Sequence, residues 1–255
     1  MVSRYEVWLN DTALSSIDPA IHLTDIAYDP IQPERTTTKH AGRDGSYSGR
    51  RDSISANKTT VSFTVRKYST TERQRVVNEI QRWATAGGWL KTSDRQGQRI
   101  YTVCTKLPAV QSAMRWLDTL TVEFTAYDWP FWEDEIPNAV TISNGGSGTL
   151  LSNGARPCDV EAVITAGASV SSFTITCGST SITLSSISLS NGDTVNISYT
   201  EDHHLLEIKK GATSLLDKRT AASSDDLIAQ PGTNAVSFTC SASATCKFIA
   251  KGAYL

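Results

Sequence analysis

The run of residues best suited to chemistry is Glu201-Asp-His-His204, because imidazole and carboxylate groups together can bind a divalent metal ion. Neighbouring residues of a strand point to opposite faces of the sheet, so His203 and His204 cannot easily share one ion. The chain has four histidines, and a site with two or three of them would also need His22 or His40 from the other half. We therefore expect this run to be a solvent-exposed turn, with no metal ion and no cofactor.

Two acidic clusters, Asp225-Asp226 and Glu133-Asp-Glu135, could supply the paired carboxyl groups of a glycoside hydrolase. That reaction needs one carboxyl group in an apolar pocket beside a surface that binds the sugar. Both clusters lie among polar residues typical of loops, which favours exposure to solvent. The sequence also lacks a Gly-x-Ser-x-Gly motif. It therefore predicts that the protein is not an enzyme, and a hydrolase with unrecognised acids remains the third-ranked alternative.

Binding of phosphate or nucleic acid is not supported by the sequence. Gly42-Arg-Asp-Gly45 lacks the Gly-x-x-x-x-Gly-Lys spacing and the following helix of a phosphate-binding loop, so we expect a tight turn. Residues 1–130 carry a net charge of +3 and residues 131–255 a net charge of −5, as counted from their Lys, Arg, Asp and Glu residues. Neither half is basic enough to indicate a surface that binds nucleic acid.

The cysteines are scattered, at Cys104, Cys158, Cys177, Cys240 and Cys246. They form no Cys-x-x-Cys pair, which argues against a zinc site or a redox motif. We expect buried free thiols, since free cysteine packs as a small apolar residue. Cys240 and Cys246 could flank a hairpin and approach each other, but their spacing alone does not show a bond.

Length and hydropathy indicate a globular chain. Its 255 residues, 39% of them apolar, are enough for one large domain or two ordinary ones. No apolar run approaches the roughly 20 residues that span a bilayer, so we expect no membrane insertion. The segment Met1–Leu9 is too short and too polar for a secretory signal and reads as a first strand. We therefore expect the protein to fold in a cytoplasm.

The first half of the chain is expected to be an α+β domain, a β-sheet or barrel with one helix. Apolar and polar residues alternate in Thr59-Thr-Val-Ser-Phe-Thr-Val-Arg66, which predicts a half-buried strand. The other expected strands are an edge strand near residues 3–9 and strands over residues 99–106 and 118–127. Residues 10–58 read as irregular. Their part 33–58 is long for a loop, so we expect it to contain a hairpin or to serve at an interface.

A capping box, Ser69-Thr-Thr-Glu72, begins the expected helix over residues 70–86, and Gly87-Gly88 ends it. One apolar stripe should face the sheet; it consists of Val76, Val77, Ile80, Trp83 and Ala84. Three arginines lie on the same helix: Arg73, Arg75 and Arg82. They form either a solvated face or a contact with a neighbouring subunit, and the sequence does not choose between these.

A domain boundary is expected near residue 130, because all six tryptophans lie at or before Trp132. Beyond it the chain is rich in Ser, Thr and Gly. An aromatic cluster should pin this crossing to a domain surface; its members are Trp129, Pro130, Phe131 and Trp132. Pro130 and Pro137 restrict the chain to extended geometry. The expected segments are a first domain over residues 1–130, a linker over 131–145 and a second domain over 146–255.

The second half is expected to be an all-β sandwich or jelly roll, since short alternating segments are separated by glycine-containing turns. The expected strands cover residues 159–165, 172–177, 182–184, 195–199, 205–208, 235–240 and 245–250. Such sandwiches often bind sugars, and the ligand candidates for that role are Tyr199, His203 and His204. From residue 133 onward the chain has no tryptophan and only two tyrosines, Tyr199 and Tyr254, which argues against a strong carbohydrate site.

Taken in order, these features resemble the distal tail (Dit) protein family of long-tailed bacteriophages. The match covers about the first 130 residues. It consists of the turn Gly42-Arg-Asp-Gly45, Tyr47, Arg50-Arg51, strand 59–66, helix 70–86, the break Gly87-Gly-Trp-Leu90, a polar hairpin around Asp94, strands 99–106 and 118–127, and the closing Tyr127-Asp-Trp-Pro-Phe-Trp132. The second half resembles the galectin-like or jelly-roll domain of that family by its architecture only.

The resemblance implies a structural role in the virion, at the distal end of the tail. Members of the family form a homo-hexameric ring, whose first domain builds the ring and its channel while the second projects outward. The ring joins the tail tube protein to the baseplate hub, and DNA passes through the lumen without sequence recognition. The candidates for subunit contacts are Gly42, Arg43, Gly45, Tyr47, Arg73, Arg75 and Arg82. The alternative is a carbohydrate- or receptor-binding module that acts through the second domain on a host surface glycan.

Overall fold

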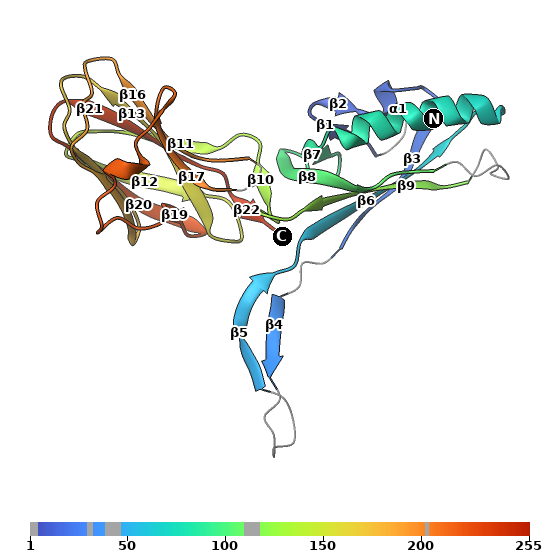
Figure 1. The fold of residues 1–255 in the computed structure, drawn as a ribbon, viewed down its shortest axis with the longest axis horizontal. Coiled ribbons are helices and arrows are strands. Elements are labelled where there is room, and N and C mark those ends of the chain that lie inside the picture. Colours follow the sequence, from blue (N-terminus) through green and yellow to red (C-terminus); the bar gives the residue numbers. More distant parts are fainter. Residues whose placement is uncertain (1–4, 30–32, 39–46, 110–117, 202–203) are drawn as a thin grey trace. The chain divides into compact units, whose positions relative to one another are not determined.

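The computed structural model describes residues 5–29, 33–38, 47–109, 118–201 and 204–255. The chain divides into two compact units: unit 1 comprises residues 1–131 with Leu255, and unit 2 comprises residues 132–254. Both are built mainly from antiparallel strands (Figure 1). In the described part, α1 (Thr70–Thr85) is the one α-helix. No described helix combines the length and the apolar surface that a membrane span requires.

Unit 1 contains an antiparallel sheet in the strand order β2-β1-β7-β8-β9-β6-β3. The strands are β1 (Val7–Leu9), β2 (Thr12–Ala13), β3 (Ile21–Tyr28), β6 (Asn57–Val65), β7 (Gly88–Thr92), β8 (Gln98–Lys106) and β9 (Leu120–Ala126). The three strands expected over residues 59–66, 99–106 and 118–127 are confirmed as β6, β8 and β9. β6 and β9 are neighbours, with Val61 opposite Val122.

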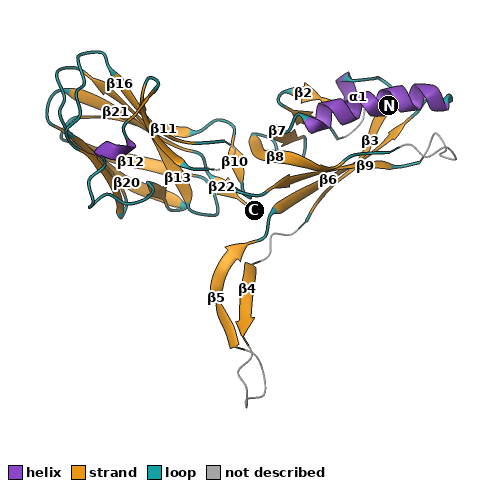
Figure 2. Cartoon of the chain, in the orientation of Figure 1, coloured by secondary structure: helices purple, strands orange, loops and turns teal. Residues whose placement is uncertain are grey.

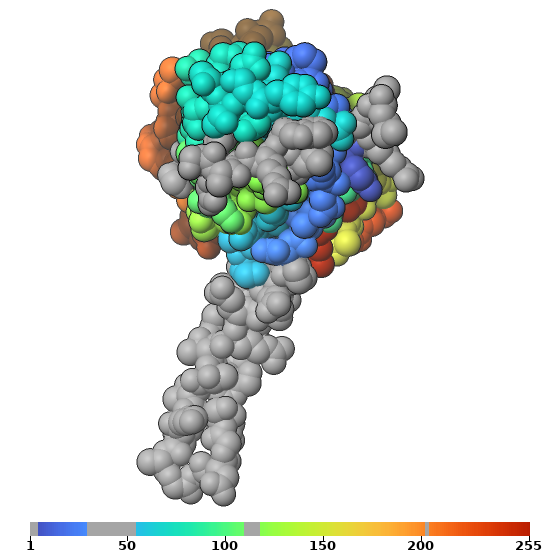
Figure 3. Space-filling model, turned by 90° about the vertical axis from the view of Figure 1, so that its right-hand side faces the viewer, coloured from blue at the N-terminus to red at the C-terminus, as the bar shows by residue number. Residues whose placement is uncertain are grey.

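Helix α1 covers one face of this sheet (Figure 2). On that face Phe63 of β6 and Phe124 of β9 are fully buried. The apolar stripe of α1 lies against them, and its buried members are Val76, Val77, Ile80 and Ala84. The other side of α1 lies on the surface of unit 1 (Figure 3). The expected stripe is thus confirmed, except that Trp83 is half-buried at its edge.

Both ends of α1 are fixed as the sequence predicts. The Ser69 hydroxyl accepts a hydrogen bond from the amide of Glu72 at 3.5 Å. At the other end Gly87 and Gly88 have φ angles of +60° and +116°, which favour glycine. The Asn10 side chain then donates to the Gly87 carbonyl at 2.8 Å and accepts from the Trp89 amide at 2.9 Å. Asn10 therefore joins the end of the helix to the start of β7.

The stretch 10–58 is not irregular, which corrects the sequence prediction. It contains β3 and a hairpin of β4 (Pro33–Thr38) and β5 (Tyr47–Ile54), so the hairpin expected within residues 33–58 is present. β3 was hidden because a register shift between Leu23 and Asp25 breaks its alternation of apolar and polar residues. The strand expected near residues 3–9 is β1, and it pairs on both sides, with β2 and β7.

Unit 2 is all-β, with two main antiparallel sheets. One has the order β11-β21-β13-β16-β17-β18 with β19 beside β13, and the other has the order β12-β20-β14-β15. The strands are β11 (Asn138–Ser143), β12 (Gly146–Ser152), β13 (Cys158–Ala166), β14 (Phe173–Cys177), β15 (Thr180–Leu184), β16 (Thr194–Tyr199), β17 (Leu206–Lys210), β18 (Thr213–Ser214), β19 (Ile228–Ala229), β20 (Gly232–Cys240) and β21 (Ala244–Ala250). Alternate residues of each sheet are buried, among them Phe173, Phe238 and Phe248, so both sheets contribute one face to the core.

The segment predicted as a linker, residues 131–145, contains regular structure instead. β10 (Trp132–Asp134) pairs with β22 (Ala253–Tyr254), and β11 pairs with β21 along its whole length. Only three residues, 135–137, separate β10 from β11. The sequence does not predict β11, because Ile142 is its single buried side chain and the apolar alternation is therefore weak.

All five cysteines are free thiols, including Cys240 and Cys246. Cys158, Cys177 and Cys246 are buried, as the sequence predicts, whereas Cys104 and Cys240 are half-buried. Burial raises the pKa of Cys177 to about 11 and that of Cys246 to about 12. These thiols are therefore protonated at neutral pH and serve as small apolar core groups.

Substitution Trp83→Ala should destabilise unit 1 without preventing its folding. The Trp83 ring packs edge-on against Phe124, with 5.8 Å between centroids, and its indole N–H donates to the Thr12 carbonyl at 3.1 Å. Because Trp83 is only half-buried, we expect a loss of about 2–3 kcal/mol. Urea unfolding followed by circular dichroism measures this loss. The exposed Thr71→Ala on the same helix is the control, and equal stability of the two variants would contradict the packing described.

Candidate functional site

Arg73 lies in the first turn of α1 and is buried, with 6% of its surface exposed. Its guanidinium group donates to the carbonyls of Lys67 and Tyr68, at 2.6 and 3.1 Å, and to the hydroxyl of Thr70 at 3.1 Å. Charge-assisted bonds of this kind fix the turn between β6 and α1. The expectation of an exposed Arg73 is therefore wrong, since this side chain is already used within its own chain.

The other two arginines of α1 remain on its outer side. Arg75 is 57% exposed and forms ion pairs with the buried Asp18, at 3.1 Å, and with Glu79, at 2.7 Å. Lys67 also approaches Asp18, at 3.4 Å. Arg82 is exposed on the last turn of the helix. Contact of Arg75 and Arg82 with a neighbouring subunit stays a prediction.

The remaining candidates for subunit contacts fall, in sequence, between the start of β4 and the end of β5. Gly42, Arg43 and Gly45 lie outside the described residues, and Tyr47 is the first residue of β5. β4 and β5 pair with each other and with no other strand in the described part of the chain. The backbone of this hairpin therefore takes no part in the larger sheet of unit 1.

The aromatic residues expected at a domain junction lie where the two units divide, between Phe131 and Trp132. In unit 1 the Trp129 and Phe131 rings meet edge-on, with 5.0 Å between centroids. The side-chain amide of Asn57 donates to the Pro130 carbonyl at 3.1 Å. Trp132, the first residue of unit 2, is fully buried. All four residues are thus packed within the fold; a role in joining two domains stays a prediction.

Tyr199 and His204, two of the candidate sugar ligands, pack against each other in unit 2. Their rings stack with 5.1 Å between centroids and an angle of 15° between planes. The Tyr199 hydroxyl accepts a hydrogen bond from the Leu227 amide, and His204 Nε2 bonds to a carboxylate oxygen of Asp159. Burial, followed by the negative charge of Asp159, raises the pKa of Tyr199. His204 covers the ring that a sugar would need, and His203 lies outside the described residues.

The two acidic clusters are not uniformly solvated: Asp225 is exposed, whereas Asp226 is half-buried, and burial raises the pKa of its carboxyl group. Glu133 is buried, which corrects the expectation of a solvated face, and Lys251 lies 3.9 Å from it. Asp134 accepts hydrogen bonds from the Gly252 amide and the Tyr254 hydroxyl, at 3.0 and 2.8 Å. These bonds tie β22 to β10. Among the described residues no group of three or more His, Cys, Asp or Glu side chains could hold a metal ion.

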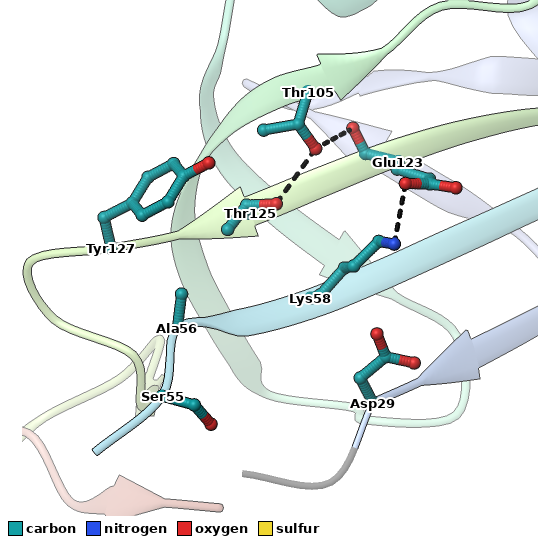
Figure 4. Close-up of a pocket in the computed structure, with 8 residues that line it drawn as sticks. All are labelled: Asp29, Ser55, Ala56, Lys58, Thr105, Glu123, Thr125 and Tyr127. Carbon is teal, nitrogen blue, oxygen red and sulfur yellow. Dashed lines mark hydrogen bonds and ion pairs between the residues drawn. The ribbon is translucent and has the colours of Figure 1, made fainter. Parts of the chain in front are cut away.

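A polar cleft of about 650 Å³ lies on the sheet face of unit 1 that α1 leaves open. Its lining residues are Asp29, Ser55, Ala56, Lys58, Thr105, Glu123, Thr125 and Tyr127 (Figure 4). Lys58 on β6 and Glu123 on β9 alternate with the buried residues that face the helix, so their side chains point the other way. Tyr127, just after β9, is 60% exposed at the edge of the cleft.

Glu123 is the electrostatic centre of this cleft. One carboxylate oxygen pairs with Lys58 at 2.7 Å and the other with Lys106 at 3.0 Å. The bond from Lys58, followed by the bond from Lys106, holds the pKa of Glu123 below its ordinary value of 4.5. Beside it the Thr105 and Thr125 hydroxyls share a hydrogen bond of 2.9 Å. The cleft thus offers paired charges and hydroxyl groups to a ligand.

Sequence reasoning missed this cleft, because its residues come from four separate segments and form no motif. The available signal was the polar half of the alternating strands. Thr60 and Ser62 of β6, like Thr121 and Glu123 of β9, occupy the positions between buried apolar residues. Side chains at such positions face solvent only when other elements cover just one face of the sheet. The pattern of a single strand does not show whether the second face is also covered.

Substitution Arg73→Ala should lower the free energy of unfolding of unit 1 by about 2–3 kcal/mol. The carbonyls of Lys67 and Tyr68 would lose their charged donor, and the turn before α1 would lose its anchor. Urea unfolding monitored by tryptophan fluorescence reports on unit 1, which holds five of the six tryptophans. Arg82→Ala, exposed on the same helix, is the matched control and should change stability by less than about 0.5 kcal/mol. A large loss of stability in Arg82→Ala and none in Arg73→Ala would contradict the anchoring role of Arg73.

Substitution Glu123→Gln should flatten the loss of stability at acidic pH. The folded-state pKa of Glu123 is lower than its ordinary value of 4.5, so its ion pairs stabilise the fold above that pH and are lost as pH falls through the depressed value. The measurement is the urea midpoint of tryptophan fluorescence between neutral pH and pH 3. We expect a shallower decline below about pH 4.5 in the variant than in the wild type. Parallel curves would show that the two lysine contacts do not stabilise the fold.

Comparison with known proteins adds to this geometry. No protein-family model matches the sequence, and no curated protein is significantly similar to it. The fold, however, is similar to that of solved phage proteins. One is the Dit protein of phage SPP1, described as a paradigm of the hub adsorption apparatus in phages that infect Gram-positive bacteria: the TM-score is 0.70 at 14% identity, over 97% of this chain and 98% of that one.

A second similar structure is a chain of the phage P2 baseplate in its activated conformation with calcium. The TM-score is 0.53 at 10% identity, and the match covers 99% of this chain and 98% of that one. At such low identity, similarity over the whole length reflects a shared fold. Both units of the chain are included in each match. The chain therefore has a phage Dit-like fold, which it shares with the SPP1 Dit protein and with this baseplate chain.

Proposed function

We propose that this chain is a distal tail protein, a structural component of the tail tip of a long-tailed phage. Six copies form a ring that joins the tail tube to the baseplate hub and leaves a channel for DNA. The observation that carries this proposal is the likeness to the SPP1 Dit protein over nearly the full length of both chains. The chain would fold in the cytoplasm of the bacterial host and reside in the virion, at the distal end of the tail.

A closed ring needs two different contact surfaces on each subunit. The β4–β5 hairpin suits one of them. A two-stranded hairpin is marginally stable in water on its own, and β4 and β5 pair with no further strand in the described part of the chain. The outer edge of β3, at the end of the sheet order, suits the other. The outward arginines Arg75 and Arg82 of α1 are further candidates.

Passage of DNA without sequence recognition agrees with the charges of unit 1. Several of its cations are paired with acids, as in Lys91 with Asp11 at 2.6 Å and in Lys67 with Asp18 at 3.4 Å. Paired cations attract a phosphate backbone less than free ones do, since counterion release scales with the number of phosphates neutralised. A lumen built from such surfaces would let DNA slide.

The alternative of a sugar- or receptor-binding module acting through unit 2 finds less support. Tyr199, the aromatic residue that it would need, has its ring covered by His204 and its hydroxyl bonded to the Leu227 amide. Sugar recognition by a sandwich commonly relies on an exposed aromatic face. We therefore assign unit 2 an architectural role, as the part of the subunit that projects from the ring.

Replacement of residues 31–54 by a short glycine-asparagine turn should abolish the ring while leaving the subunit folded. Tyr28 lies opposite Thr59, and the Asp29 amide donates to the Lys58 carbonyl at 2.9 Å, so β3 can turn directly into β6. Native mass spectrometry and negative-stain images of the wild type should show six-fold rings, and those of the variant should show monomers. An unchanged melting temperature of the variant serves as the control for folding.

The wild-type chain should be examined alone and after co-expression with a tail tube protein, because a partner can nucleate a ring. A wild-type chain that stays monomeric in both preparations would overturn the hexamer. Rings that persist in the shortened variant would instead overturn the role of the hairpin, and would leave β3 and α1 as the contact surfaces.

A further inference from the structure

The cleft on the open face of unit 1 has the size and the chemistry of a small-ligand site. Its volume of about 650 Å³ falls within the range of about 300–1,000 Å³ that small-molecule pockets have. Of its eight lining residues, six carry a polar or charged side chain and Tyr127 supplies an aromatic ring with a hydroxyl group (Figure 4). The assembly role proposed above does not require such a cleft.

The charges at the cleft balance, which decides the charge of the ligand. The two carboxylate oxygens of Glu123 form ion pairs with Lys58 and Lys106. The other carboxylate of the cleft, Asp29, is exposed at the rim. The hydrogen bond to Glu123 raises the pKa of Lys58 most, and the negative charge of Asp29 raises it further. With Lys106, which lies beside the lining residues, the two cations and two anions carry no net charge, so the cleft exerts little long-range attraction on an ion. A neutral ligand is therefore favoured over an anionic or a cationic one.

The polar groups of the cleft fit a ligand rich in hydroxyls. The Thr105 hydroxyl donates to the Glu123 carbonyl at 3.3 Å and shares a hydrogen bond of 2.9 Å with the Thr125 hydroxyl, so both oxygens keep lone pairs that can accept a bond from a ligand hydroxyl. Tyr127 is 60% exposed and offers a ring face on which the apolar face of a sugar can stack. We propose that this cleft binds a neutral saccharide, with Tyr127 as the stacking platform and Thr105 as a hydrogen-bonding partner.

This site differs from the sugar site that the sequence suggested in unit 2. There the aromatic ring of Tyr199 is covered by His204. In unit 1 the ring of Tyr127 is exposed, and four polar lining residues lie on strands β6, β8 and β9: Lys58, Thr105, Glu123 and Thr125. A stiff sheet holds hydroxyls at fixed positions, which reduces the entropy lost when a ligand binds. A peptide is less suited to the cleft, because an extended peptide binds a strand edge and these residues lie on a sheet face.

The test uses the full chain and two neutral trisaccharides, chitotriose and maltotriose, in saturation-transfer NMR and calorimetric titration. We expect at least one of them to bind, and we expect its affinity to be the same at low and high salt. Tyr127→Ala should weaken binding about tenfold through loss of the stacking contact. Thr105→Val, which keeps the side-chain shape, should also weaken it. Tyr68→Ala, at a tyrosine of the same unit that is 89% exposed and lies before α1, is the matched control and should bind as the wild type does.

Failure of both trisaccharides to bind would overturn the proposal. So would binding that Tyr127→Ala and Tyr68→Ala weaken equally, since the ligand would then lie elsewhere. Titration with inorganic phosphate and with arginine amide tests the charge argument, because tighter binding of either ion would contradict a neutral ligand. These outcomes are independent of ring formation: a hexamer without saccharide binding leaves the assembly function intact, and saccharide binding by a monomer leaves the cleft intact.

Discussion

The packing of α1 against one face of the unit 1 sheet is the interaction on which the rest of this unit depends. Phe63 and Phe124 are fully buried beneath the helix, with Val61 opposite Val122 in the β6–β9 pair. Because side chains alternate along a strand, burial of this set sends the intervening residues to the other face. A one-residue slip in the register would exchange the two faces, so the helix also fixes where Lys58 and Glu123 lie. The open polar face is thus a consequence of the cover on the opposite side.

The two units protect their sheets in different ways. In unit 2 the outer edge of β15 is bonded by the segment that follows β18: the Thr220 amide donates to the Thr183 carbonyl at 3.0 Å, and the Ser224 amide to the Ser181 carbonyl at 2.7 Å. Serine hydroxyls complete this cover, as when Ser223 accepts from the Thr183 amide. Unit 1 instead has the β4–β5 hairpin and the outer edge of β3, which find no strand partner among the described residues. Open edges invite pairing with another chain, which is the reason that the proposed ring contacts use these two elements.

The sequence predicted the elements whose pattern is local. β6, β9 and α1 were found because each carries a full period of apolar residues, and α1 also has its cap at Ser69 and its glycine stop. β3 was missed because its register shift lies inside the strand, and β11 because one buried residue, Ile142, makes its pattern too weak. Arg73 was taken for a surface residue, since nothing local shows that the carbonyls before the helix need a donor. In each case the deciding partner lies outside the segment.

The cleft, too, is formed by residues whose neighbours lie in other segments of the chain, and this affects how its function can be inferred. Its side chains come from positions 29, 55–58, 105 and 123–127, which only the strand order β8-β9-β6-β3 brings together. The SPP1 Dit protein shares this fold at 14% identity, so a common fold is compatible with very different residues at most positions. The likeness between the two proteins is one of fold, and the fold suffices to propose a ring. The identities of Tyr127, Thr105 and Glu123 are not dictated by that fold, because a polar residue of almost any kind can occupy the open face. Ligand binding at this face must therefore be argued from these particular side chains, because the fold by itself does not require a ligand there.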